Sequence, residues 1–264
     1  MKIVSLSSGS SGNSTFISYK DKKILIDCGI SLKMLKQRLK DIDEKVEDID
    51  YLFLTHCHDD HTKCLLTLMG STNIKAYSRE QILRETYERF SKELIPLDKN
   101  RLYTIPDDAT TISIDDDFKL NIYEAHHDVR CVYYKFYCGD NIFAILTDNG
   151  HYDDNIIDSL KDVNYLMLEC NYDYDMLMEY SKYPDFLKTR ISGDNGHLSN
   201  ESCCEVIKTI ANDKLKLVCL SHISEHSNTE EYALQYVTDY FSKSKDIKLP
   251  RIIVASRYNV TKVL

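Results

Sequence analysis

The chain has 264 residues, of which 43% are hydrophobic and 28% are charged, and its formal net charge at pH 7 is −9. This length supports a sizeable core, and we expect residues 1–264 to form a single domain. The negative charge argues against a protein that coats nucleic acid through a broad basic surface, although bound divalent ions would add positive charge that the formal count omits.

The sequence lacks the features of a membrane or exported protein. No apolar run reaches the roughly 18–20 residues that a membrane-spanning helix needs, and the first residues do not show the charged and then apolar segments of a secretory signal. The nine cysteines are an odd number without disulfide-like spacing, which is typical of reduced thiols. We therefore expect a cytoplasmic protein that does not contact membranes.

Short runs rich in β-branched and aromatic residues alternate along the chain with stretches of helical periodicity. In chain order, strands are expected at 2–6, 15–19, 22–29, 50–55, 119–127, 132–138, 141–148, 163–170, 214–222 and 251–256. Helices are expected at 31–40, 79–92, 200–210 and 229–241. This mixture predicts an α/β layered protein, with two sheets covered by helices as a reasonable form.

The segment that follows the strand expected at 50–55 carries the strongest chemical signal. It reads Thr55-His-Cys-His-Asp-Asp-His61, so three of the nine histidines lie within six positions. Imidazole nitrogens and carboxylate oxygens are the ligands that zinc, manganese and iron accept. His56 and His58 lie two apart and point the same way in an extended segment, whereas Asp60 and His61 follow where the chain turns into a helix. The segment predicts a metal site rather than an ordinary solvated loop.

The pattern His-x-His-x-Asp-His resembles the signature of the metallo-β-lactamase superfamily. The resemblance implies that fold, an αββα sandwich in which two mixed sheets carry helices on their outer faces. Three later segments match the family in order, and they contain His127 in EAHHDV, Asp148 in AILTDNG and His222 in CLSHIS. The implied metal ligands are His56, His58, Asp60, His61, His127, Asp148 and His222.

In the implied metal centre, His56, His58 and His127 hold one divalent ion. Asp60, His61 and His222 hold a second one, and Asp148 and a solvent hydroxide bridge the two. Zinc or manganese is favoured, with iron as a third option, because these ligand types suit all three metals. Asp60 is also a candidate catalytic residue, since it can orient the hydroxide.

Asp27 and His126 border this set. Asp27, at the end of the strand expected at 22–29, matches an early aspartate of the family that supports the ligand loop without binding metal. An ordinary turn carboxylate at a strand end is the alternative. His126, the neighbour of His127, is expected to face elsewhere.

Three further segments resemble a bacterial subgroup of the superfamily known as YycJ or WalJ. They are Gly9–Ser14, Leu168–Asp173 and Gly193–Asn200. The subgroup is associated with exonuclease action on DNA in the cytoplasm, so the resemblance implies a dinuclear-metal phosphodiesterase that acts on DNA in preference to RNA, with 5′ end polarity favoured. The sequence departs from the subgroup at Val129, Arg130, Asn149, His151 and Tyr172.

His197, in the third of these segments, is the second candidate catalytic residue. We expect it to bind a phosphate oxygen or to protonate the leaving 3′ oxygen, as imidazole is able to do. A plain turn with a helix N-cap at Ser199 or Asn200 is the alternative, and both roles are compatible. Lys188 and Arg257 are weaker candidates for phosphate contacts.

Two other functions use the same fold. One is a small-molecule hydrolase that cleaves a thioester, lactone or β-lactam with the same metals. The other is a non-catalytic nucleic-acid-binding module, although such a protein would be expected to have lost ligands. The histidine at position 197 favours phosphodiesters over small molecules.

Overall fold

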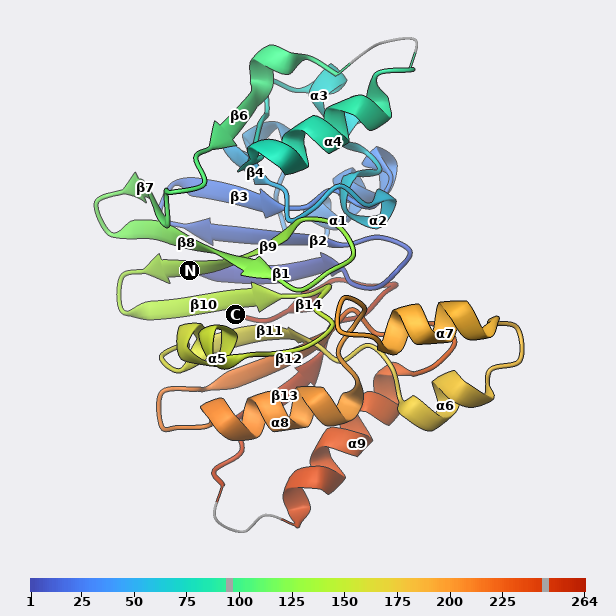
Figure 1. Cartoon of the computed structure of the whole chain (residues 1–264). Helices are drawn as coiled ribbons and strands as arrows, with labels where there is room; N and C mark the ends of the chain where they lie inside the picture. Colours follow the sequence, from blue (N-terminus) through green and yellow to red (C-terminus); the bar gives the residue numbers. More distant parts are fainter. Residues whose placement is uncertain (94–96, 244–246) are drawn as a thin grey trace. The chain divides into compact units, whose positions relative to one another are not determined.

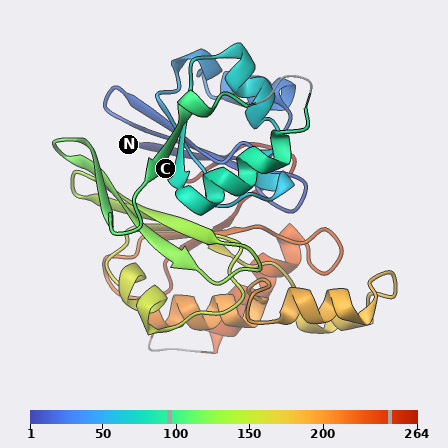
Figure 2. The same cartoon turned by 45° about the horizontal axis from the view of Figure 1, so that its top comes forward.

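The computed structural model describes residues 1–93, 97–243 and 247–264, which separate into two compact units. Unit 1 comprises Met1–Thr110 and Ser256–Leu264, and unit 2 comprises Thr111–Ala255. Each unit contains one seven-stranded mixed sheet with helices around it (Figure 1 and Figure 2). That residues 1–264 form a single domain stays a prediction.

The sheet of unit 1 has the strand order β14-β1-β2-β3-β4-β5-β6. Its strands are β1 (Lys2–Ser7), β2 (Ser14–Tyr19), β3 (Lys22–Ile26), β4 (Tyr51–Phe53), β5 (Lys75–Arg79), β6 (Leu102–Ile105) and β14 (Thr261–Lys262). Neighbours from β14 to β3 pair antiparallel, and neighbours from β3 to β6 pair parallel. The helical segments are α1 (Leu32–Lys40), the 3-10 turn η1 (Val46–Asp48), α2 (Asp59–Thr62), α3 (Leu65–Ser71), α4 (Glu80–Phe90) and the 3-10 turn η2 (Lys99–Arg101).

Helix α1 shows how the sequence builds the core of unit 1. The Ser31 side chain caps the helix by accepting a hydrogen bond from the backbone N–H of Met34. Leu35 and Leu39 lie four positions apart and therefore on one face of the helix, and both are completely buried in the cluster that also contains Leu25 and Leu52. The apolar face of α1 thus packs in the same core as strands β3 and β4, whose carboxyl ends carry the residues described below.

The sheet of unit 2 has the strand order β13-β12-β11-β10-β9-β8-β7. Its strands are β7 (Thr111–Asp115), β8 (Phe118–Ala125), β9 (Cys131–Cys138), β10 (Asn141–Leu146), β11 (Tyr165–Glu169), β12 (Leu217–Ser221) and β13 (Arg251–Val254). Neighbours from β10 to β13 pair parallel, and neighbours from β7 to β10 pair antiparallel. The helices are α5 (Asp154–Leu160), α6 (Tyr174–Glu179), α7 (Asp185–Ser192), α8 (Asn200–Ile210) and α9 (Glu230–Ser242).

Helix α8 covers the parallel part of this sheet. Val206 and Ile207 are completely buried in one cluster with Leu166 of β11 and Val218 of β12. Because β8, β10, β11 and β12 run in the same direction, their carboxyl ends meet at one edge of the sheet. Polar residues directly after these strands are therefore brought close together.

All ten expected strands and all four expected helices are present. The helix expected at Asp60 and His61 is α2, whereas the sequence patterns did not predict β5, β6, β7, β14 or the short helices α3, α5, α6 and α7. Strand β3 ends at Ile26 rather than Gly29, because Asp27 leaves the strand with a positive φ of 58°. Across the described ranges, no helix is long and apolar enough to cross a membrane.

Candidate metal centre

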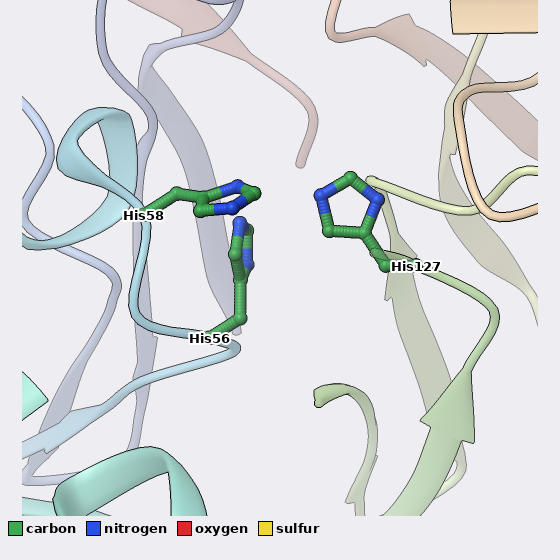
Figure 3. Close-up of side chains that lie close together, drawn as sticks. All are labelled: His56, His58 and His127. Carbon is green, nitrogen blue, oxygen red and sulfur yellow. The ribbon is translucent and has the colours of Figure 1, made fainter. Parts of the chain in front are cut away.

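In unit 1, the histidine-rich segment follows β4 and leads into α2. His56 is completely buried, and His58 is the N-cap residue of α2. The ring centroids of His56 and His58 lie 4.7 Å apart (Figure 3), and those of His56 and His61 lie 4.1 Å apart. Asp60 is in the first turn of α2, with its Oδ2 3.5 Å from Nε2 of His61. The loop therefore brings together four of the predicted ligands.

Asp27 supports this loop from the end of the parallel neighbour β3. Its carboxylate accepts hydrogen bonds from the backbone N–H of Thr55 (2.8 Å), the Thr55 hydroxyl (2.9 Å) and Nδ1 of His61 (2.8 Å). Burial raises the pKa of the Asp27 carboxyl above its usual value, and the His61 ring opposes that shift. Asp27 thus combines the two roles considered from the sequence, since it ends a strand and also orients His61.

The β1–β2 loop holds the Asp60 turn from another side. The backbone N–H of Asn13 donates to the carbonyl oxygen of Asp60 (2.7 Å), and the Asn13 side-chain nitrogen lies 3.2 Å from Oδ2 of Asp60 and 2.9 Å from Nε2 of His61. Gly29 packs against the same turn, because a Cβ atom at position 29 would lie 1.6 Å from the Asp60 carbonyl oxygen. The position of Asp60 is therefore set by backbone contacts as well as by α2.

In unit 2, Asp148 follows β10, Glu169 ends β11 and His222 follows β12, so all three lie at the same edge of the sheet. Asp148 and His222 both have positive φ angles, of 57° and 54°, which turn the chain sharply after each strand. Ligand atoms of Asp148, Glu169, His197 and His222 all lie within 4.8 Å of one another. Unit 2 therefore gathers two predicted ligands, the candidate catalytic His197 and a further carboxylate.

Glu169 is the central residue of this group and is completely buried. Its carboxylate accepts hydrogen bonds from Nδ1 of His197 (2.7 Å), Nδ1 of His222 (2.8 Å), and the backbone N–H groups of Asn149 (2.9 Å) and Leu198 (3.2 Å). Burial raises the pKa of Glu169, but the two imidazoles outweigh it and lower the pKa to about 2. The carboxylate is thus ionised and orients both rings.

His197 is held by the loop that joins α7 to α8. Its backbone N–H donates to the carbonyl oxygen of Ile191 (2.9 Å), and its side chain is only partly buried. Ser199 is the N-cap of α8 and accepts from the backbone N–H of Ser202. The capping role considered from the sequence therefore belongs to Ser199, which leaves the His197 ring to contact Glu169 and, with centroids 5.2 Å apart, to lie against His222.

His127 and His126 follow β8 and point to different neighbours. Nδ1 of His127 lies 3.2 Å from the carbonyl oxygen of Gly196, in the loop that holds His197, and Figure 3 shows the His127 ring extending from the chain after β8. His126 instead stacks on His151, with ring centroids 3.9 Å apart, and lies 3.4 Å from Asp153. His126 therefore faces elsewhere, as predicted.

The predicted histidine ligands share an arrangement that suits a bound metal ion. In four of them Nδ1 contacts a protein oxygen, so Nε2 is the nitrogen that would coordinate an ion. These contacts join His56 to Thr55, His61 to Asp27, His127 to Gly196 and His222 to Glu169. Metal-binding histidines are held by such outer hydrogen bonds, and carboxylates complete the donor set, so the residues fit divalent ions.

Glu169 and Asn13 were not assigned roles from the sequence, although both lie in segments that resemble the subgroup. Two sequence features could have indicated a supporting role: Glu169 lies at the end of an expected strand, and Asn13 lies in a glycine-rich loop. The two weaker candidates for phosphate contacts, Lys188 and Arg257, donate hydrogen bonds to groups of the protein itself. Lys188 donates to the carbonyl oxygen of Met178, and Arg257 is mostly buried and donates to the hydroxyl of Ser11 (3.0 Å).

Comparison with known proteins finds matches over most of the chain. The model of the metallo-beta-lactamase superfamily matches residues 8–222. The chain is 33% identical over 229 residues to the exodeoxyribonuclease WalJ of Streptococcus pneumoniae. The alignment covers 86% of this chain and 83% of that protein. It is 28% identical over 234 residues to the exodeoxyribonuclease YycJ of Bacillus anthracis. This alignment covers 88% of this chain and 86% of that protein.

Solved structures show the same fold. The metallo-beta-lactamase fold protein YhfI of Bacillus subtilis superposes with a TM-score of 0.72 at 14% sequence identity, and the alignment covers 98% of each chain. The fold predicted from the sequence is therefore confirmed, with two mixed sheets of seven strands and helices around them.

Proposed function

Because the chain belongs to the metallo-β-lactamase superfamily, we propose that it is a metal-dependent nuclease that removes nucleotides from an end of DNA. The observation that carries the proposal is the arrangement around Glu169. One buried carboxylate orients both His222, a proposed ligand, and His197, which lies outside the proposed ligand set. The relatives of similar length, WalJ and YycJ, are named exodeoxyribonucleases, and these names support DNA as the proposed substrate.

We assign the two divalent ions to the ligands named from the sequence. His56, His58 and His127 would hold one ion, and Asp60, His61 and His222 the other, with Asp148 shared. When bound, such ions activate a water molecule as nucleophile and neutralise the charge on a phosphate. Zinc and manganese are the proposed metals, because the donor set is imidazole and carboxylate.

The residues of this chain supply the remaining chemistry. Asp60 would orient the nucleophilic water, since its carboxylate lies in the first turn of α2 beside His61. His197 would contact a phosphate oxygen or donate a proton to the leaving 3′ oxygen, because Glu169 holds its Nδ1 and leaves Nε2 for the substrate. Degradation from the 5′ end is the polarity we propose.

A cytoplasmic location completes the proposal. None of the nine cysteines takes part in a disulfide, and eight of them are buried. Small buried thiols of this kind are stable in a reducing compartment.

The direct test is a cleavage assay with purified protein and added zinc or manganese. The substrates are linear DNA labelled at the 5′ or the 3′ end, closed circular DNA, RNA and a set of thioesters. We expect linear DNA to be shortened from its 5′ end while circular DNA stays intact. Hydrolysis of thioesters without cleavage of DNA would contradict the proposal and favour a small-molecule hydrolase.

A matched pair of neighbouring histidines provides the control for the metal assignment. His127→Ala should abolish cleavage, because a proposed ligand is lost, and His58→Ala and Asp148→Asn should do the same. His126→Ala should keep most of the activity, since the His126 ring faces His151 and Asp153. Equal activity of the two neighbouring variants would show that the ligand assignment is wrong.

A further inference from the structure

Helices α6 and α7 of unit 2 form a hairpin, residues 174–192, that carries unusually exposed aromatic rings. Phe186 is 75% exposed and Tyr174 is 58% exposed. In the part of the chain that the structure describes, Tyr258 of unit 1, at 68%, is the one other large apolar side chain with more than half of its surface exposed. Both Figure 1 and Figure 2 show the hairpin projecting away from the strands of its own unit.

The rings continue along the hairpin. Tyr180 stacks on His226 with an interplanar angle of 9° and ring centroids 5.0 Å apart. Tyr183 lies edge-on to both, at centroid distances of 4.7 Å from Tyr180 and 5.8 Å from His226. We call Tyr174, Tyr180, Tyr183, Phe186 and His226 the aromatic set.

The hairpin is joined directly to the two loops that carry His197 and His222. The carbonyl oxygen of Ile191, near the end of α7, accepts a hydrogen bond from the backbone N–H of His197 (2.9 Å). His226 lies four residues after His222 in the loop that follows β12. In the same loop, the carbonyl oxygen of Ser227 accepts a hydrogen bond from the backbone N–H of Asp173, the N-cap of α6 (2.8 Å). Backbone hydrogen bonds therefore connect the hairpin, at the end of α7 and at the start of α6, to the loops that carry His197 and His222.

The charges of the hairpin indicate what kind of contact it makes. Its cations are Lys182, Lys188 and Arg190, and its anions are Asp175, Glu179 and Asp185, so the two signs balance. Lys188 is bonded to a backbone carbonyl, and Arg190 pairs with Asp128. A surface without net charge attracts phosphates weakly, whereas exposed aromatic rings stack on the faces of nucleobases of any sequence.

We propose that the aromatic set binds unpaired nucleotides of the DNA substrate by base stacking and so holds a single-stranded end next to His197. This inference rests on the proposed nuclease function. It identifies the preferred substrate as DNA with a single-stranded end, because bases inside a duplex are already stacked on each other. It also predicts that the contribution of the hairpin to binding depends little on salt, since it involves few phosphate contacts.

The test measures binding of a fluorescent single-stranded oligonucleotide with phosphorothioate linkages, and of the same sequence as a blunt duplex. Phe186→Ala and Tyr174→Ala should each weaken binding of the single strand by about ten-fold, the change in Kd that corresponds to loss of one stacked base. Both side chains are mostly exposed, so the melting temperature should not change. Tyr258→Ala is the matched control and should bind like the wild type.

Phe186→Leu separates stacking from a plain apolar contact. Leucine keeps apolar surface but has no aromatic face, so it should bind as weakly as the alanine variant, while Phe186→Tyr should restore binding. If leucine binds like phenylalanine, or if all hairpin variants bind like the wild type, the inference is wrong even though the nuclease function stands. If the wild type neither binds nor cleaves DNA, both fail. Dissociation of a dimer in the hairpin variants, with unchanged DNA binding, would instead show contact with a second copy of the chain.

Discussion

At the scale of single residues, Glu169 contacts two histidines that have different proposed tasks. Nδ1 of His222 and Nδ1 of His197 lie 2.8 Å and 2.7 Å from the same carboxylate oxygen. The first contact orients a proposed metal ligand, and the second orients a ring proposed to meet the substrate. Variants at these positions should therefore separate metal binding from catalysis.

Glu169→Gln should weaken metal binding. An amide cannot accept all four hydrogen bonds that the carboxylate accepts, and loss of the partner that orients a ligand histidine typically costs about 10–100-fold in metal affinity. The measurement is competition with a chromogenic chelator, alongside the melting temperature of the metal-free protein. Unchanged affinity would show that Glu169 does not orient a ligand.

His197→Ala should impair catalysis without weakening metal binding. We expect both metals to be retained and the catalytic constant to fall by roughly 10²–10⁴-fold, as for a lost proton donor. His126→Ala is the histidine control, because the His126 ring stacks on His151 and its Nε2 lies 3.4 Å from Oδ2 of Asp153, away from the loop that holds His197. Loss of a metal ion in His197→Ala would mean that His197 is a ligand.

At the scale of helices, strands and loops, close backbone approach positions the proposed ligands. Gly29→Ala should be strongly destabilising and should lower metal content, since the new Cβ atom would overlap the Asp60 carbonyl oxygen. Gly70→Ala is the matched control. Position 70 lies in α3 with open space around it, so alanine should stabilise the protein by about 0.5–1 kcal/mol. Thermal melting and elemental analysis of both variants provide the test.

Helix α5 offers a pH-dependent test of capping. Asp153 accepts a hydrogen bond from the backbone N–H of Ile156, and this bond lowers the pKa of the carboxyl below 3.8. Asp153→Ala should cost about 0.5–2 kcal/mol near neutral pH. Because the pKa is lower in the folded state, this contribution is complete above pH 3.8 and is lost as the pH falls below it. Asp153→Asn, which caps without titrating, should remain close to the wild type in urea unfolding at neutral pH.

At the scale of the whole molecule, metal removal should reduce stability. Ions that bind only the folded protein stabilise it by about 2.7 kcal/mol at a free concentration of one hundred times Kd. We therefore expect a chelator to lower the melting temperature, and added zinc or manganese to restore it with two ions bound per chain. One well-occupied site in excess metal would contradict the shared role of Asp148.

The sequence by itself predicted the metal chemistry and determined most of the elements, because both depend on local patterns. The His56–His61 loop contains its donor atoms within six positions, and strands such as β10 and β11 are visible as apolar runs. The elements that were missed have weak local patterns. β7 alternates between exposed and partly exposed residues, β14 has two residues, and α7 buries none of its side chains.

Only the tertiary structure showed that Glu169 and Asn13 support the proposed ligands. Glu169 contacts His197 and His222, which lie 28 and 53 positions later, because parallel strands bring their carboxyl ends to one edge of the sheet. Asn13 reaches Asp60 for a similar reason, since the β1–β2 loop meets the end of β4 in the same sheet. Such pairings depend on strand order, which a single sequence does not contain. Asp27 was expected as a supporting residue only through the family resemblance, and the supporting contacts of Glu169 and Asn13 came from the structure.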